Sequence, residues 1–541
     1  LMMWVFRSPR LLLLGFVSTA LGIVCALAAT LLIFGKLHLL TLVFGASLIG
    51  EAVDYSIQYF VVYLGSGREW DARRGARMVR PALGVALTTS LLGYAILMWV
   101  PFPALKQIAC FAMVGIATAF ASVLWLLPAL LTRAPKHNPR RLFAAAARLL
   151  ARWQKTLGGK RAWLVAALLL IASVPGWLRL TSDDDIHLLI QRDASLAAQE
   201  DAVRAAVGVD NSAQFFVVRG ATQEAVLQRA EALGAKLDAL NGTADSVGGY
   251  QSIAQFVPSA QRQSEDRALL AQHVFNDPTA LRATLLQAGF KDEVADAWLG
   301  AFAKPPAPLT VERWLATPWS QPYRYLWLGA VGSNEEANEM HAAGYAAVVI
   351  PQGVTPRNEP ALIALAHGLP GIVFVDKAAS VSKLFGEYRV DTGWWLGGTL
   401  ALVCVLLMLR YGARGGIATT LPVLLAVGVA LAMFGYAGVS LNLFNWLALM
   451  LVLGVGANYA VFLREGCSRE DADLGAVWTG VLLSAATALL SFGMLGISAM
   501  PALKSFGATL ALGIAVAVLL APIGMPAAKS SGRPSESRRA A

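Results

Sequence analysis

The apolar residues of this chain are gathered into long, nearly uninterrupted blocks, and this arrangement limits the fold more than any other feature. Of the 541 residues, 57% are hydrophobic and 14% are charged, whereas a soluble domain carries roughly 25% charged residues. The blocks are about 17 to 25 residues long, the length at which a helix crosses the roughly 30 Å hydrocarbon core of a bilayer. The sequence therefore predicts a polytopic α-helical membrane protein.

About ten complete apolar blocks are present, five on each side of a long polar segment. We expect spanning helices at residues 11–34, 40–63, 82–100, 108–131, 162–178, 394–409, 417–437, 441–463, 476–497 and 508–525. The first six residues read as the end of an apolar helix, so we expect the sequence to begin partway through a larger protein.

Basic residues are crowded into particular loops, and this fixes the expected orientation. The arginine-rich loops fall on one side if the spans alternate, and they are residues 7–10, 68–80, 133–161, 410–414 and 533–539. The positive-inside rule assigns this side to the cytoplasm. The protein is then expected in the inner membrane of a two-membrane bacterium, with the polar domain in the periplasm. Because the net charge of +10 is explained by these loops, no nucleic-acid partner is expected.

These patterns divide the chain into six expected segments. They are a first transmembrane bundle at 1–132, a basic cytoplasmic linker at 133–161, a spanning helix at 162–178, a periplasmic domain at 179–391, a second bundle at 392–526 and a cytoplasmic tail at 527–541.

The polar domain alternates strand and helix patterns. We expect strands at 214–219, 346–350 and 371–375, with helices at 222–240 and 360–367. Such alternation indicates an α/β sandwich, whereas residues 251–318 are polar and predicted to be mostly helical.

Residues that could bind a metal are scattered along the chain. The acidic turn of Asp183, Asp184 and Asp185 could bind a cation, but a solvated turn is the expected state. The four cysteines and the histidines show no metal-binding spacing, so neither a metal site nor a cofactor is predicted.

Three segments of the first half recur in the same order in the second half. Residues 50–55 match 454–459, residues 88–97 match 486–495, and residues 100–106 match 498–504. The offset is nearly constant and the expected orientation is the same, which indicates two parallel-repeat transmembrane bundles related by an axis along the membrane normal. Transporters use such repeats and place functional sites at the interface between them.

Glu51 and Asp54 are the only acids well inside the expected spans. Three positions apart, they share one helix face. Burial disfavours the charged form of a carboxyl, so we expect either acid to take up and release protons near neutrality. The alternative for both is hydrogen bonding between packed helices, and it is stronger for Glu51 because its counterpart in the repeat is Val455.

Other polar residues surround this pair in the expected bundle. Tyr55 and Tyr459 offer hydroxyls, and Asn458 occupies the position of Asp54 in the second half, where it can hydrogen-bond but cannot titrate. Hydroxyl side chains recur on the next span of each half, at Thr88, Thr89, Ser90, Thr487 and Ser491. They are expected to join packed helices, with a hydrated path as the alternative.

The Gly-x-x-x-Asp-Tyr pattern at 50–55, its counterpart at 454–459 and the segment 501–507 resemble the MMPL branch of the resistance-nodulation-division (RND) superfamily. The polar domain, at 183–187 and 215–221, is similar to the predicted exporters of that branch, some of which are associated with aryl-polyene pigment or lipid pathways. The resemblance implies twelve transmembrane helices, with porter domains after helices one and seven. If this architecture is mapped onto the sequence, the sequence starts near the end of the family's helix two. Residues 179–391 then correspond to the second porter domain.

The resemblance also implies proton influx through Asp-Tyr pairs on helices four and ten. It assigns a proton relay to Asp54, Tyr55 and Tyr459, while Asn458 stands where many members have a second aspartate. The position of Glu51 inside the same span adds it to the relay as an assisting acid. We therefore predict a proton-motive-force-driven exporter of a hydrophobic or lipid-linked molecule, either an aryl-polyene pigment or a lipid. Its expected partners are that substrate, membrane lipids, protons, and periplasmic or outer-membrane proteins.

Two other classes of membrane protein are alternatives to an exporter. A lipid-linked transferase would need a nucleophile, a metal site or an acid pair near the outer surface. The sequence shows none, so no catalytic residue is predicted and the chain is not expected to be an enzyme. The remaining alternative is a non-transporting accessory or sterol-sensing-like membrane protein of a lipid pathway, which shares the helical repeat.

Overall fold

The computed structural model divides into two compact units, a helical unit (Leu1–Gln191 and Ser382–Ala541) and a mixed unit (Arg192–Val381). The structure describes residues 2–39, 41–42, 45, 52–99, 103–135, 138–157, 160–184, 194–207, 214–243, 245–304, 307–331, 344–355, 357–469 and 472–526.

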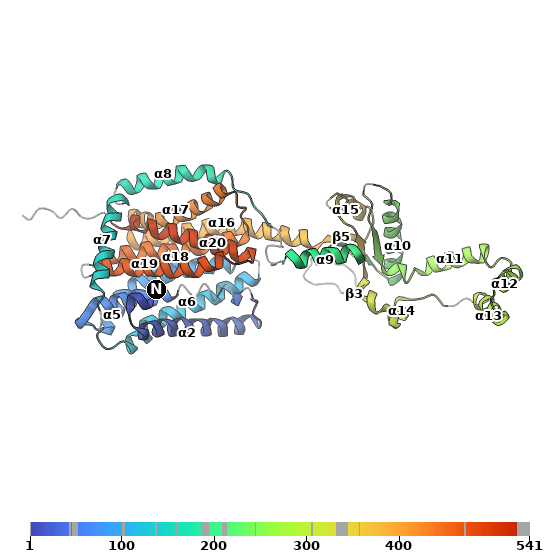
Figure 1. The fold of residues 1–541 in the computed structure, drawn as a ribbon, viewed down its shortest axis with the longest axis horizontal. Helices are drawn as coiled ribbons and strands as arrows, with labels where there is room; N and C mark the ends of the chain where they lie inside the picture. Colours follow the sequence, from blue (N-terminus) through green and yellow to red (C-terminus); the bar gives the residue numbers. More distant parts are fainter. Residues whose placement is uncertain are drawn as a thin grey trace, which may run out of the picture. The chain divides into compact units, whose positions relative to one another are not determined.

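The helical unit consists of helices from both ends of the chain (Figure 1). Its first part contains α1 (Met2–Phe6), α2 (Pro9–Phe34), α4 (Ala52–Ser66), the 3₁₀ helix η1 (Gly67–Glu69), α5 (Ala72–Leu97), α6 (Pro103–Leu130), α7 (Arg140–Leu157) and α8 (Lys160–Trp177). Its second part contains α16 (Lys377–Tyr411), which begins in the mixed unit, then α17 (Ala413–Ala437), α18 (Leu443–Cys467), α19 (Leu474–Gly496), α20 (Pro501–Leu520) and η5 (Ala521–Gly524).

Eight helices in the described part of the chain are long and apolar enough to cross a membrane. They are α2, α5, α6, α16, α17, α18, α19 and α20, and each overlaps one of the expected spans. The expected span at 162–178 corresponds to α8, which forms a candidate span only together with α7, from which it is bent by 72°. The expected span at 40–63 lies partly outside the described residues and partly in α4. The prediction of a polytopic helical membrane protein is confirmed.

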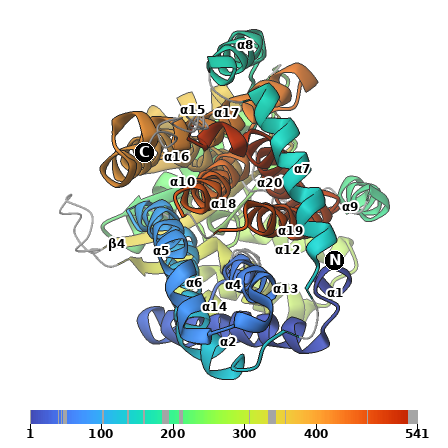
Figure 2. The same ribbon diagram turned by 90° about the vertical axis from the view of Figure 1, so that its left-hand side faces the viewer.

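Helix α18 lies in the interior of the helical unit, as the view along the helices shows (Figure 2). It packs against α5, α17, α19 and α20, and 94% of its most apolar 18-residue window is buried, compared with 28% for α16. Its start is fixed by a capping box, in which the Asn442 side chain accepts from the backbone N–H of Asn445 and the Asn445 side chain accepts from that of Asn442. Helix α4 is also almost wholly buried, among α2, α5, α6 and α19.

Helix α7 lies in the segment predicted to be a basic linker. Its apolar residues recur every three or four positions, so Phe143, Ala146 and Leu150 are buried in the core of the helical unit while the arginines face outward. It packs on α19 so closely that a Cβ atom at Gly475 would lie 2.2 Å from the Phe143 carbonyl oxygen. The linker is therefore part of the packed unit.

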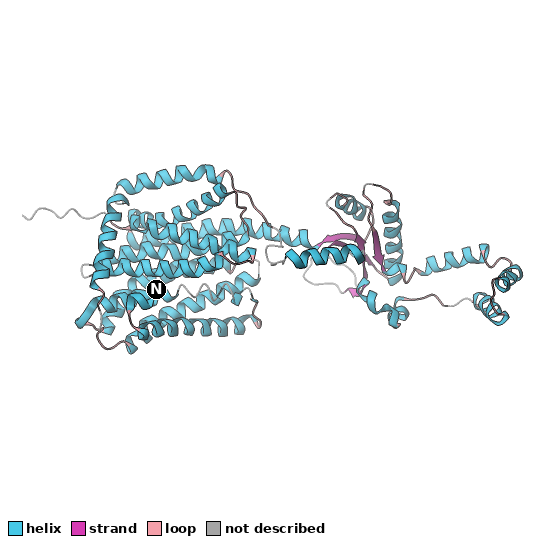
Figure 3. Ribbon diagram, viewed as in Figure 1, coloured by secondary structure: helices cyan, strands magenta, loops and turns pink. Residues whose placement is uncertain are grey.

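The mixed unit contains one sheet with helices beside it (Figure 3). Its strands are β1 (Gln214–Gly220), β2 (Gly249–Ser252), β3 (Trp327–Val331), β4 (Gly344–Gln352) and β5 (Ile372–Asp376). The order is β2-β4-β1-β5, β3 also pairs with β4, and every pairing is antiparallel. Phe216 and Val218, two positions apart on β1, share a core with Val226 and Leu233 of α10 (Gln223–Ala239). The expected strands at 214–219, 346–350 and 371–375 are confirmed.

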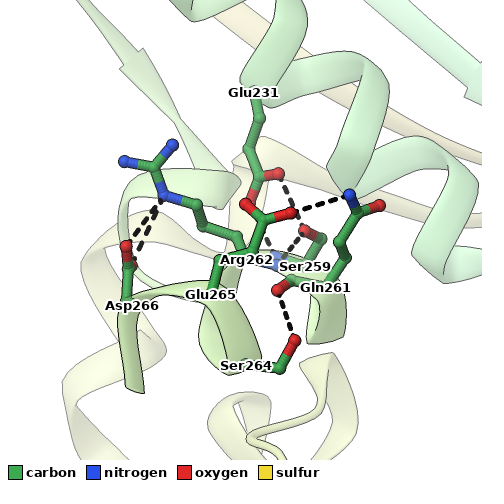
Figure 4. Close-up of polar contacts among 7 residues, drawn as sticks. All are labelled: Glu231, Ser259, Gln261, Arg262, Ser264, Glu265 and Asp266. Atoms are coloured by element: carbon green, nitrogen blue, oxygen red, sulfur yellow. Dashed lines mark hydrogen bonds and ion pairs between the residues drawn. The ribbon is translucent and has the colours of Figure 1, made fainter. Parts of the chain in front are cut away.

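The other helices of the mixed unit are α9 (Ala194–Val207), α11 (Ala260–His273), α12 (Pro278–Gln287), α13 (Asp292–Ala303), α14 (Val311–Leu315) and α15 (Glu359–His367), with η3 (Ile253–Gln255) and η4 (Pro318–Leu326). The start of α11 is anchored to α10, because Glu231 accepts hydrogen bonds from the Ser259 backbone N–H (2.7 Å) and hydroxyl (2.8 Å) (Figure 4). Beyond it, Arg282 of α12 forms ion pairs with Asp292 (2.7 Å) and Asp296 (2.6 Å) of α13. The expected helical character of residues 251–318 is confirmed.

Candidate functional site

The two residues at the centre of the expected relay, Asp54 and Tyr55, lie on α4 in the interior of the helical unit. The Asp54 side chain is 4% exposed and Tyr55 is fully buried. Ser56 and Gln58 follow them on the same helix and are buried as well. Glu51, the other predicted acid, lies outside the described residues.

Helix α4 packs against α19 of the second half, and one close contact is at Gly480. A Cβ atom at Gly480 would lie 3.0 Å from both side-chain amide atoms of Gln58, and one at Gly65 would lie 4.0 Å from the Ala476 side chain. As the residue numbers on α4 fall, those on α19 rise, so the two helices run antiparallel. Asp54 lies four residues before Gln58, and Ser484 lies four residues after Gly480. Because the helices are antiparallel, Asp54 and Ser484 are therefore at the same level, about one helical turn from the Gln58–Gly480 contact.

Two polar atoms near this contact are buried without a hydrogen-bond partner among the described residues. They are Gln58 Nε2 on α4 and Ser484 Oγ on α19. A buried polar atom without a partner costs about 1–3 kcal/mol. The sequence did not point to Gln58 or Ser484, because only the tertiary packing determines which side chains meet between α4 and α19.

Asn458 and Tyr459 lie at the counterpart position on α18 and are 2% and 0% exposed. The Asn458 side chain reaches α5 of the first half, where it accepts a hydrogen bond from the Thr89 hydroxyl (3.3 Å) and donates one to Ser90 Oγ (3.5 Å). Thr89 and Ser90 therefore join packed helices, as the sequence predicted.

The remaining predicted hydroxyl residues have different surroundings. Thr487 is directed back to its own helix, with its hydroxyl 3.1 Å and 2.8 Å from the carbonyl oxygens of Leu483 and Ser484. Thr88 and Ser491 are exposed on the helix surface. Within the described residues, the structure thus brings Asn458, Thr89 and Ser90 together.

The acidic turn that precedes the mixed unit differs from the expectation of a solvated loop. The Arg389 Nε atom donates to both carboxylate oxygens of Asp184, at 2.8 Å and 3.1 Å, and each side chain is only 20% exposed. The positive charge on α16 explains this burial, which the local sequence did not reveal. Asp185 lies outside the described residues, and the described part of the chain contains no group of three or more metal-binding side chains.

Two comparisons with known proteins bear on this arrangement. Residues 377–532 match the model of the MMPL family. The chain is also similar to the hopanoid transporter HpnN of Burkholderia multivorans, with 25% identity over an alignment of 583 positions that covers 96% of this chain and 64% of that protein. The chain thus spans slightly less than two thirds of the length of this relative. The predicted resemblance to the MMPL-type transporters of the RND superfamily is confirmed.

Proposed function

We propose that this MMPL-type chain belongs to a proton-driven exporter that moves a hydrophobic or lipid-linked molecule from the inner membrane. The hopanoid transporter that it resembles supports a lipid substrate. A hopanoid is therefore the first substrate to test, and an aryl-polyene pigment is the second.

The observation that carries this proposal is the burial of the Asp54 carboxyl on α4, among the apolar helices of the helical unit. A charged group at such a depth is costly, and acids there are typically part of an ion or proton path. The unpartnered polar atoms of Gln58 and Ser484 support a hydrated path beside it, because water would satisfy them. We propose that Asp54 carries the proton, with Tyr55 and Glu51 assisting it.

The pattern of helix packing supports a parallel repeat. Helices α2, α4, α5 and α6 pack on one another in the same pairs as α17, α18, α19 and α20, and α4 packs on α19 as α18 packs on α5. The Thr89 and Thr487 hydroxyls both approach carbonyl oxygens three and four residues earlier on their helices. In this repeat Asn458 is the non-titrating counterpart of Asp54, and Tyr459 is the counterpart of Tyr55.

The proposed topology follows from the basic loops. Residues 133–161 and 527–541 would lie in the cytoplasm, and residues 179–391 would form a periplasmic porter domain that contains the mixed unit. Residues 1–132, 162–178 and 392–526 would form the membrane part. Protonation of Asp54 would change the packing of α4 on α19, and periplasmic or outer-membrane proteins would receive the substrate.

The test uses a strain that lacks the full-length protein and is complemented with wild type, Asp54→Asn or Asp54→Glu. Lipids of the two membranes are separated and quantified by mass spectrometry, with hopanoids and pigments measured individually, at matched expression levels. We expect Asp54→Asn to reproduce the deletion and Asp54→Glu, which retains a titratable carboxyl, to restore part of the export.

Normal export by Asp54→Asn would overturn the coupling mechanism. A protonophore provides the second measurement, because export by the wild type should stop when the proton gradient collapses. An unchanged lipid distribution after collapse would instead favour the non-transporting accessory function.

A further inference from the structure

A groove of about 780 Å³ lies on the helical unit between α5, α6 and α16. Three arginines line it, Arg77 and Arg80 on α5 and Arg410 on α16, and no acidic residue is among its lining. The rest of the lining is almost entirely apolar and includes Leu87 and Leu406. The groove therefore combines positive charge with an apolar wall.

The arginines and the apolar wall are arranged along one helix face. Arg77, Arg80, Gly84 and Leu87 follow one another at intervals of three or four residues, the spacing of one side of an α-helix. The rise from Arg77 to Leu87 is about 15 Å. This is half of the roughly 30 Å hydrocarbon thickness, the depth of a single leaflet.

The positive charge of the groove is only partly neutralised by the protein. Arg410 donates a hydrogen bond to Glu465 (2.9 Å), whose carboxylate also accepts one from the Tyr411 hydroxyl (2.9 Å). Arg77 and Arg80 are exposed and form no ion pair with a carboxylate in the described ranges. The groove therefore suits an anionic occupant.

Gly84 leaves room along the wall. A Cβ atom at Gly84 would meet no other atom within 4 Å. On the same helix, by contrast, a Cβ atom at Gly75 would lie 2.4 Å from the Trp70 ring. Gly75 is thus needed for packing against its neighbour, whereas Gly84 faces open space that an acyl chain can fill.

We propose that this groove binds an anionic glycerophospholipid, with its phosphate between Arg77 and Arg80 and an acyl chain along Gly84, Leu87 and Leu406. Basic pockets between transmembrane helices recognise lipid headgroups in this way. The lipid is a resident of the leaflet at the arginine-rich end of the helices. This site is independent of the proposed export and of the relay at Asp54.

The test measures lipid binding to the full chain in detergent by native mass spectrometry, with dioleoylphosphatidylglycerol and dioleoylphosphatidylcholine as probes. Wild type should prefer the anionic lipid by at least about tenfold, because an arginine near a headgroup contributes about fivefold in affinity. Arg77→Gln with Arg80→Gln should weaken binding of the anionic lipid about 25-fold and weaken phosphatidylcholine binding much less, because the choline group cancels the charge of its phosphate.

Two further variants separate the groove from general surface charge. Gly84→Trp fills the groove while the arginines remain, and it should also reduce binding of the anionic lipid. Leu406→Trp fills it from α16 and replaces Gly84→Trp if that variant does not fold. The matched control is Arg148→Gln with Arg152→Gln on α7, which removes two exposed arginines outside the groove and should change affinity less than twofold.

The proposal is overturned if Arg77→Gln with Arg80→Gln binds the anionic lipid as wild type does, or if the control pair weakens binding equally. It is also overturned if the groove-filling variants retain full affinity, because the acyl chain would then lie elsewhere. Displacement of the lipid by millimolar inorganic phosphate would contradict it as well, since that result indicates a site for phosphate alone.

Discussion

The crossing of α8 and α17 provides a stringent test of the packing in the helical unit. A Cβ atom at Gly435 would lie 1.9 Å from the carbonyl oxygen of Gly176, and one at Gly176 would lie 2.5 Å from the carbonyl oxygen of Ala432. The atoms that approach are backbone atoms, so no side-chain rotation can relieve the contact. We predict that Gly435→Ala destabilises the protein.

The magnitude follows from the contacts at the crossing. To restore ordinary van der Waals distances, α8 must retreat by about 1.5 Å, and overpacking of this kind costs about 1–3 kcal/mol. The retreat also strains two hydrogen bonds, from Trp177 Nε1 to the Gly428 carbonyl (2.8 Å) and from the Tyr436 hydroxyl to the Ala172 carbonyl (2.5 Å).

Each interhelical bond of this kind contributes about 0.6 kcal/mol in a membrane protein. Alanine returns at most about 1 kcal/mol through its higher helix propensity. The net loss should be about 1–3 kcal/mol.

Gly398→Ala is the matched control for this substitution. Gly398 lies inside α16, is exposed, and would place its Cβ atom in open space. It should be neutral or stabilising by up to about 1 kcal/mol. Thermal unfolding of both variants in detergent, measured on the full chain, gives the comparison. Equal stabilities would refute the close backbone contact between α8 and α17.

Two other predictions concern separate parts of the chain. Asn458→Leu removes the bonds to Thr89 and Ser90, so it should lower the unfolding free energy by about 1 kcal/mol; a melting curve identical to that of wild type would contradict this. In the mixed unit, the hydrogen bond from Arg282 lowers the pKa of Asp296 below its ordinary value of 3.8. Because the pKa of Asp296 is lowered in the folded state, its ionised carboxylate stabilises the packing of α12 on α13 at any pH above 3.8. This stabilisation is lost as the pH falls through the lowered pKa of the folded state. Hydrogen exchange over residues 278–303, corrected for intrinsic rates, should therefore rise in wild type only below about pH 4, whereas Arg282→Gln should show the raised exchange at pH 7. If residues 278–303 of Arg282→Gln were still protected from exchange at pH 7, the ion pairs of Arg282 would not be what holds α12 and α13 together.

Much of the helical unit could be predicted from sequence because length and hydrophobicity alone determine a membrane span. The ends of helices were harder. The span expected at 394–409 belongs to α16, which already begins at Lys377, because Glu387, Arg389 and Asp391 interrupt the hydrophobic pattern without ending the helix. Helix α7 was hidden for a similar reason, since its arginines masked the periodic positions of its buried residues.

The candidate site could be predicted only in part. Asp54 was recognisable because an acid in an apolar block has few structural explanations, and Asn458 because the repeat assigned it a counterpart. The contact between Gln58 and Gly480 joins residues more than four hundred positions apart. The sequence around Gln58 or Gly480 does not indicate which residue each one contacts. Only the folded structure could therefore reveal the buried polar atoms without hydrogen-bond partners beside them.

The enclosure of both α4 and α18 by other helices has a mechanical consequence. A helix that borders lipid can shift sideways at little cost, because fluid acyl chains refill the space it leaves. Helices α4 and α18 have almost no such border, and a close-packed protein interior transmits strain instead of absorbing it. Any displacement that begins at Asp54 must therefore pass to α19 and its neighbours, and it cannot be dissipated in the bilayer.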